Sequence, residues 1–212
     1  MVKRTYVYVD GFNLYYRALR KATFKWLNLE VLMQGLLDPD NDIQCIRYFT
    51  APVSGKFDPG VPVRQQRYLK ALSSLPTVSI HQGNFLTKPK MRPLVNPLPG
   101  GPTHVEIWNT EEKGSDVNLA TYLIHDAWRG LFDVAVVLSQ DTDLNEPVRI
   151  VRDEIGKSVG VIVLDGKSPG KLSTFGSFVR HITQADLAAA QFPEAVSFGD
   201  KGKTVTRPTE WS

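Results

Sequence analysis

Two almost continuously apolar segments constrain this chain most, at residues 132–138 (FDVAVVL) and 159–164 (VGVIVL). A strand with one solvated face alternates apolar and polar residues, whereas a strand that is apolar throughout is covered on both faces. Such strands are typical of parallel sheets, whose neighbouring strands are joined by crossovers that usually contain a helix. The two segments therefore predict an α/β protein with a buried parallel sheet.

The rest of the chain alternates in the same way between strand-like and helix-like segments. Further strands are predicted at residues 5–9, 43–50 and 77–81, and helices at residues 12–20, 29–37, 62–74, 116–128, 146–155 and 185–190. A short helix is also expected within residues 168–178. Because strand and helix alternate, we expect right-handed crossovers and a mostly parallel sheet.

Residues 88–103 (KPKMRPLVNPLPGGPT) interrupt this alternation with five prolines and two adjacent glycines. Proline lacks a backbone donor and glycine favours turns, so we expect no regular element through the middle of this segment. A loop of this length in a compact domain is usually functional or mobile. Residues 84–86 are expected to extend the strand at 77–81, and residues 105–108 to pair back on that strand.

Length and composition predict one domain over residues 1–192 and a polar C-terminal tail over 193–212 that frays. A net charge of +3 is too small for a basic field over the whole molecule. The single cysteine, Cys45, excludes an internal disulfide. The sequence shows neither a signal peptide nor a membrane-spanning run, which predicts a soluble cytoplasmic protein. The oligomeric state stays open, with a homo-oligomer as one option.

Four aspartates lie where three predicted strands end: Asp10, Asp116, Asp141 and Asp143. Neighbouring parallel strands end at one edge of a sheet, so residues far apart in the chain can converge there. Clustered carboxylates either take up protons or bind a cation, and an all-oxygen site suits Mg²⁺ or Mn²⁺. Any one aspartate could simply cap a helix. The pair Asp141 and Asp143 favours a metal site, since one residue would suffice as a cap.

Three motifs resemble a known family when taken in order: VDGFN, EKGSDVNLA and LSQDTDLNEPVRIV. Over roughly residues 4–190 the chain resembles the NYN domain, a branch of the PIN-like ribonuclease superfamily. The resemblance implies a Rossmann-like three-layer α/β/α sandwich whose acidic pocket binds Mg²⁺ or Mn²⁺ and cuts RNA. By motif position, the family's acidic residues fall on Asp10, Asp116, Asp141 and Asp143, with Asn13 and Ser139 as supporting polar groups.

The expected activity is therefore metal-dependent endoribonuclease activity, in which a metal-bound water attacks the RNA phosphodiester. Two positions depart from many family members, with Gln140 in place of glycine and Leu144 in place of phenylalanine. This departure keeps open an RNA-binding or assembly module without turnover. A phosphatase with an aspartyl nucleophile at Asp141 is the other alternative. The VDGFN motif counts against it, because it lacks a second aspartate.

Four basic residues are candidates for contacts with RNA, although they are a less specific signal than the aspartates: Lys88, Lys90, Arg92 and Lys113. Lysine and arginine could follow the phosphate backbone while Phe85 meets a base. The same residues could equally form a solubilising loop. The four histidines show no zinc-ligand spacing with each other or with the cysteine.

Overall fold

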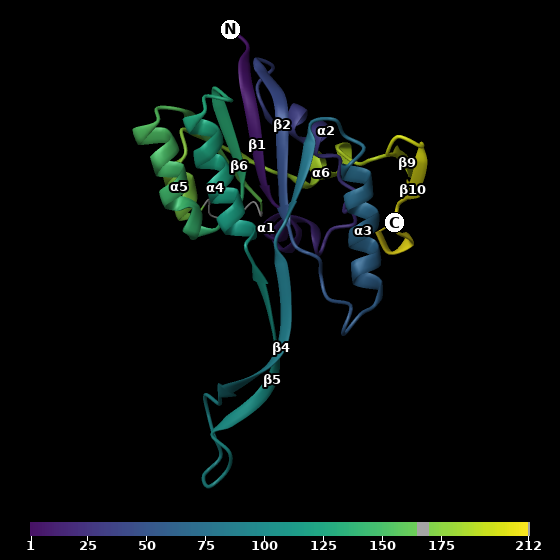
Figure 1. Ribbon diagram of the computed structural model, residues 1–212, viewed down its shortest axis with the longest axis vertical. Helices are drawn as coiled ribbons and strands as arrows, with labels where there is room; N and C mark the ends of the chain where they lie inside the picture. The colour runs from purple at the N-terminus through teal and green to yellow at the C-terminus, as the bar shows by residue number, and fades with distance from the viewer. Residues whose placement is uncertain (165–169, 212) are drawn as a thin grey trace.

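The computed structural model describes residues 1–164 and 170–211. Its centre is a six-stranded sheet in which every neighbouring pair of strands is parallel (Figure 1). In spatial order the strands are β3 (Val78–Gln82), β2 (Asn41–Thr50), β1 (Lys3–Asp10), β6 (Val134–Leu138), β7 (Ser158–Val163) and β8 (Phe178–His181). The parallel sheet predicted from the apolar runs is confirmed.

Helices cover both faces of this sheet and complete the three-layer α/β/α sandwich (Figure 1). One face is covered by α4 (Ser115–Trp128) and α5 (Asn145–Arg149), and the other by α2 (Leu29–Leu36), α3 (Gly60–Leu72) and α6 (Gln184–Ala189). Successive side chains of a strand point to opposite faces. Accordingly Val136 of β6 belongs to the core cluster that includes residues of α2 and α3, and Val137 belongs to the cluster that includes residues of α4 and α5. No helix among the described residues is long and apolar enough to cross a membrane.

Two predicted helices are present but include π-helical turns. The helix expected at 12–20 is α1 (Gly11–Leu14) followed by a π-helical turn at Tyr15–Leu19. The helix expected at 146–155 is α5 followed by a π-helical turn at Ile150–Glu154. Such turns inside helices are often found at functional sites.

The segment between β7 and α6 also differs from the sequence prediction. The short helix predicted within 168–178 falls partly on residues 165–169, which lie outside the described residues. Its described part contains a 3₁₀ turn at Lys171–Phe175, and the edge strand β8 follows without having been predicted.

The proline-rich segment at residues 88–103 is irregular only in part: residues 94–103 form no helix or strand, as expected, but residues 88–93 belong to a strand. Strands β4 (Asn84–Pro93) and β5 (His104–Lys113) pair antiparallel as a hairpin that projects from the sandwich (Figure 1). The expectation that residues 84–86 and 105–108 join the strand at 77–81 is therefore wrong. A two-stranded ribbon has two free edges, and proline is tolerated there because its missing N–H needs no partner. Pro89 lies opposite Trp108 in this ribbon.

The fraying expected after residue 193 is also wrong. Strands β9 (Ala195–Phe198) and β10 (Lys203–Thr206) form a second antiparallel hairpin, and Val196 and Val205 are buried in the core. Trp211 packs on Trp26 and Tyr68, with ring centroids 6.3 and 6.1 Å apart. The segment is polar on average, but its apolar residues alternate along the strands and face the sandwich.

Candidate functional site: an acidic cavity at the end of β1 and β6

The strand order creates a crevice at the carboxyl ends of β1 and β6. From β1 the chain builds β2 and β3 on one side, and later β6, β7 and β8 on the other. Val9 of β1 lies beside Leu138 of β6, so the residues that follow these two strands lie close together. Such a reversal of strand order is where open α/β sheets bind their ligands.

Acidic side chains from separate chain segments line one cavity of about 330 Å³ at this place. Asp10 comes from the end of β1, Asp116 from the first turn of α4, and Asp141 from the segment after β6. The remaining lining residues are Phe12, Asn13, Tyr16, Arg17, Phe85, Thr110 and Glu112. The structure thus gathers three of the four predicted aspartates around one space.

Asp10 is almost completely buried and has two fixed hydrogen-bond donors. Its Oδ1 accepts from the backbone N–H of Asn13 at 2.8 Å, which caps α1, and its Oδ2 accepts from the hydroxyl of Ser139 at 3.0 Å. Burial raises the pKa of Asp10, the two hydrogen bonds oppose this effect, and the charges of Asp141 and Glu112 add to it. Asp10 therefore both caps a helix and supplies charge to the cavity.

Asn13 and Ser139 tie the sequence motifs together. The Asn13 side-chain oxygen accepts from the backbone N–H of Gln140 at 3.2 Å. The Ser139 hydroxyl accepts from the backbone N–H of Asp141 at 3.1 Å while it donates to Asp10. These contacts fix Asp10 and Asp141 relative to each other across the end of the sheet.

Asp116 shows the excess of negative charge most clearly. Its pKa is raised to about 6, first by burial and then by the charges of Asp10, Asp141, Glu112 and Asp143. A raised carboxyl pKa means that the neighbouring groups disfavour the ionised form. A cation in the cavity would reverse that preference.

Asp141 and Asp143 have different positions although they are two residues apart. Asp141 lines the cavity, and its Oδ1 accepts from the backbone N–H of Asp143 at 3.0 Å, which caps a 3₁₀ turn at Thr142–Leu144. Asp143 is exposed and does not line the cavity. Its charge still contributes to the raised pKa of Asp116.

Glu112 is an acidic lining residue that sequence reasoning missed. Its Oε1 accepts from the backbone N–H and the hydroxyl of Ser115, at 2.9 and 2.6 Å, at the start of α4. In the β4–β5 hairpin it lies opposite Phe85, which also lines the cavity. The available signal was its place two residues before Gly114 in the EEKGSDV segment.

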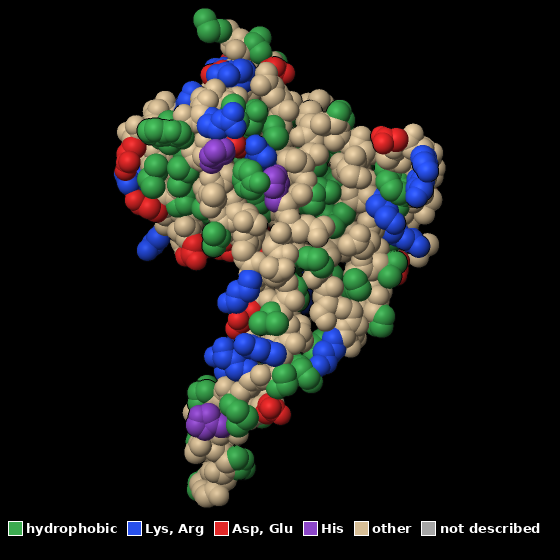
Figure 2. All heavy atoms as spheres, viewed as in Figure 1, with side chains coloured by type: hydrophobic (Ala, Val, Ile, Leu, Met, Phe, Trp, Pro, Cys, Tyr) green, Lys and Arg blue, Asp and Glu red, His purple; other side chains and the backbone are tan. Residues whose placement is uncertain are grey.

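The four basic candidate residues lie along one face of the β4–β5 hairpin and do not line the cavity. Opposite residues of an antiparallel pair share a face, and the face alternates along each strand. By this register Lys88, Lys90, Arg92 and Lys113 share one face of the hairpin, and Phe85, Thr110 and Glu112 share the other. Lys90 and Lys113 both pair with Glu111, at 3.4 and 3.1 Å. Figure 2 shows blue side chains gathered along this hairpin.

The donor set of the cavity fits a hydrated Mg²⁺ or Mn²⁺ ion. Within residues 1–164 and 170–211, no three His, Cys, Asp or Glu side chains stand close enough to form a closed cage for a metal. Mg²⁺ does not need such a cage, because it keeps several waters and is usually held by one or two carboxylates. Asp10, Asp116 and Asp141 provide carboxylates, and Asn13 provides an amide.

Comparison with known proteins places most of the chain in one family. The NYN domain family matches residues 4–180. A relative from Pseudomonas putida, 6-hydroxy-3-succinoylpyridine 3-monooxygenase HspA, is 30% identical over 98% of this chain and 75% of its own length. A crystal structure of a protein of unknown function from Vibrio parahaemolyticus has a TM-score of 0.52 at 15% identity, over 86% of this chain and 94% of that one, which supports the fold alone. The chain belongs to the NYN domain family.

Proposed function

We propose that the protein is a Mg²⁺- or Mn²⁺-dependent endoribonuclease that hydrolyses phosphodiester bonds of RNA. One observation carries this proposal: Asp10, Asp116 and Asp141 line a single cavity at the ligand-binding edge of a parallel sheet. The raised pKa of Asp116 supports it, since carboxylates that repel one another need a counter-charge. Membership in the NYN domain family, a PIN-like nuclease fold, agrees with this chemistry.

In this proposal one or two of Asp10, Asp116 and Asp141 would contact the metal directly, and the remaining carboxylates would hold it through its waters. A bound divalent ion supplies a water of lowered pKa and offsets charge on the leaving oxygen. Ser139 and Asn13 hold Asp10 and the segment after β6 in place through their hydrogen bonds. Asp143, predicted as a fourth ligand, acts through its charge, because its side chain does not line the cavity.

The two departures from the family pattern leave the cavity open. The Gln140 side-chain oxygen accepts from the backbone N–H of Leu164 at 3.1 Å, and Leu144 is buried in the core against α4 and α5. Neither residue lines the acidic cavity. This geometry favours turnover over the alternative of an RNA-binding module that has lost catalysis.

Cleavage of a labelled single-stranded RNA with Mn²⁺ tests the proposal. We expect the wild type to cut, and Asp10→Asn and Asp141→Asn to lose cleavage by at least about two orders of magnitude, as when transition-state charge stabilisation is removed. Asp200→Asn, an exposed aspartate in the β9–β10 turn, is the matched control and should cut like the wild type. Equal cleavage by all four proteins would overturn the assignment.

A second candidate is oxidation of a small aromatic ring, the reaction named for the Pseudomonas putida relative. One observation favours it: a second cavity of about 120 Å³, walled by aromatic side chains such as Tyr15, Tyr48 and Trp211. Incubation with 6-hydroxy-3-succinoylpyridine, dioxygen and a nicotinamide reductant would test it by mass spectrometry. Product that depends on dioxygen would favour this candidate over the nuclease.

A further inference from the structure

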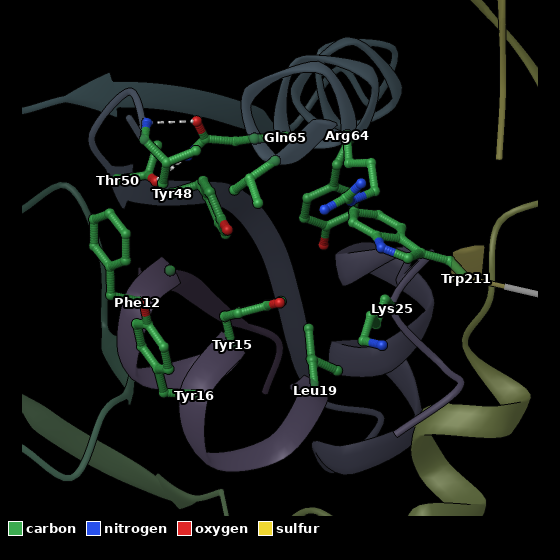
Figure 3. A pocket seen from close by; sticks show the side chains of 14 residues that line it. Phe12, Tyr15, Tyr16, Leu19, Lys25, Tyr48, Thr50, Arg64, Gln65 and Trp211 are labelled. Atoms are coloured by element: carbon green, nitrogen blue, oxygen red, sulfur yellow. Dashed lines mark hydrogen bonds between the residues drawn. The ribbon is translucent and has the colours of Figure 1, made fainter. Parts of the chain in front are cut away.

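A second cavity lies beside the acidic one, and its walls are aromatic (Figure 3). Its volume is about 120 Å³. The rings that line it belong to Phe12, Tyr15, Tyr16, Tyr48, Tyr68 and Trp211. A cavity of this order holds one six-membered ring, since an apolar cavity of about 150 Å³ binds benzene.

The two cavities share a wall. Phe12 and Tyr16 line both of them, and their rings stack with centroids 6.5 Å apart. Phe12 also stacks on Phe85 of the hairpin at 5.9 Å, on the acidic side. The two cavities therefore adjoin each other at Phe12 and Tyr16.

The phenol hydroxyls of Tyr15 and Tyr48 point into the aromatic cavity (Figure 3). Neither hydroxyl has a hydrogen-bond partner among the described residues. Tyr48 packs closely against Gly11, where an added Cβ would lie 2.7 Å from its hydroxyl. Burial raises the pKa of Tyr48, so its hydroxyl is protonated at neutral pH. Both groups are available to a ligand.

The cationic groups of the cavity differ in availability. Arg64 is already paired with Asp58 at 2.7 Å and Glu210 at 3.2 Å. Lys25 lines the cavity without an ion pair to any described residue. The cavity therefore offers stacking surfaces, two hydroxyls and one unpaired ammonium group. These are partners for a flat ring that carries carbonyl oxygens.

We infer that the aromatic cavity binds the pyrimidine base of the nucleotide whose phosphate lies in the acidic cavity. This inference rests on the proposed ribonuclease function and adds a base preference to it. Base stacking on aromatic side chains is insensitive to sequence, whereas the volume of the cavity favours one ring over the two of a purine. The Tyr15 and Tyr48 hydroxyls bond the ring substituents, and Lys25 meets a carbonyl oxygen.

Nucleosides test the ring site without metal and without catalysis, because they carry no phosphate. In EDTA, calorimetry should show uridine and cytidine binding at least about fivefold more tightly than adenosine and guanosine. Tyr15→Ala should weaken uridine binding about tenfold, as expected for loss of one stacking partner. Tyr48→Phe, which keeps the ring, should weaken it a few-fold through one lost hydrogen bond. Trp128→Ala removes an exposed aromatic residue outside the cavity and should bind like the wild type.

Contrary results are equally defined. Equal binding of purine and pyrimidine nucleosides, or uridine affinity that survives Tyr15→Ala, would overturn the inference. The inference would also be overturned if nicotinate bound in a way that depends on Tyr15 while uridine did not bind. That result would indicate a site for small aromatic acids. A wild type that binds uridine through Tyr15 but cuts no RNA would refute the nuclease function alone. Cleavage without any uridine binding would refute the base site alone.

Discussion

Replacing Asp116 by asparagine should stabilise the metal-free protein while removing its proposed activity. The pKa of Asp116 is raised from 3.8 to about 6 by burial and by the charges around the cavity. Each pH unit corresponds to about 1.4 kcal/mol, which gives an upper bound of about 3 kcal/mol for the destabilisation by the ionised group. Asp116 is partly exposed, so screening by solvent reduces this figure to about 1–2 kcal/mol.

The direction of the pH dependence follows from the raised pKa. A carboxyl group with a higher pKa in the folded state contributes most to stability below its unfolded pKa of 3.8 and loses that contribution as pH rises through about 6. At pH 7.5 the wild type therefore bears the full destabilisation. The favourable helix-dipole interaction of Asp116 in the first turn of α4, about 0.3–1 kcal/mol, opposes the gain in the variant.

Urea unfolding in EDTA at pH 7.5 and pH 4 measures this effect. We expect the free energy of unfolding of Asp116→Asn to exceed that of the wild type by about 1 kcal/mol at pH 7.5, once screening and the helix dipole are included. At pH 4 the difference should largely vanish. Asp200→Asn on the exposed β9–β10 turn should change neither value. A variant less stable than the wild type at pH 7.5, or a gain equally large at pH 4, would refute the argument.

Three further predictions concern the metal, the core and the hairpin. In scanning fluorimetry, Mn²⁺ should raise the melting temperature of the wild type at pH 7.5 and raise it less at pH 5. The melting temperature of Asp10→Asn should not change with Mn²⁺. Equal shifts of the wild type at both pH values would contradict a carboxylate site. Asp126→Ala should lower the free energy of unfolding by about 3–5 kcal/mol, because it leaves the Arg47 guanidinium without its buried partner, 2.7 Å away. Asp133→Ala, in an exposed pair with Arg4, should lower the free energy of unfolding far less than Asp126→Ala in the same urea assay, and equal losses would refute the distinction. Neutralising the three basic side chains within residues 88–92 should weaken RNA binding and reduce the salt slope by about 2, whereas an unchanged slope would indicate a solubilising stripe.

The sandwich could be predicted because its signals are local. Residues 134–138 have no polar side chain, and all five of them, which form β6, are buried. The positions of Asp10 and Asp141 follow from the same logic, since Asp10 ends β1 and Asp141 lies three residues after the end of β6. Topology then brings together the carboxyl ends of β1 and β6.

The features that could not be predicted depend on register and on long-range packing. The prolines at 89 and 93 break a central strand but not a two-stranded ribbon with free edges. The role of Glu112 depends on where that ribbon meets α4. The aromatic cavity joins Tyr15 from a π-helical turn, Tyr48 from β2 and Trp211 from the C-terminal segment, and no local pattern connects them.

The position of Trp211 has a practical consequence for handling the protein. This side chain lines the aromatic cavity and packs on Trp26 and Tyr68. An affinity tag fused after it, or a deletion of the β9–β10 hairpin, would disturb the walls of that cavity. The amino terminus lies away from α1 and the β4–β5 hairpin (Figure 1), and Met1 and Val2 are exposed. Tags for binding measurements therefore belong at the amino terminus.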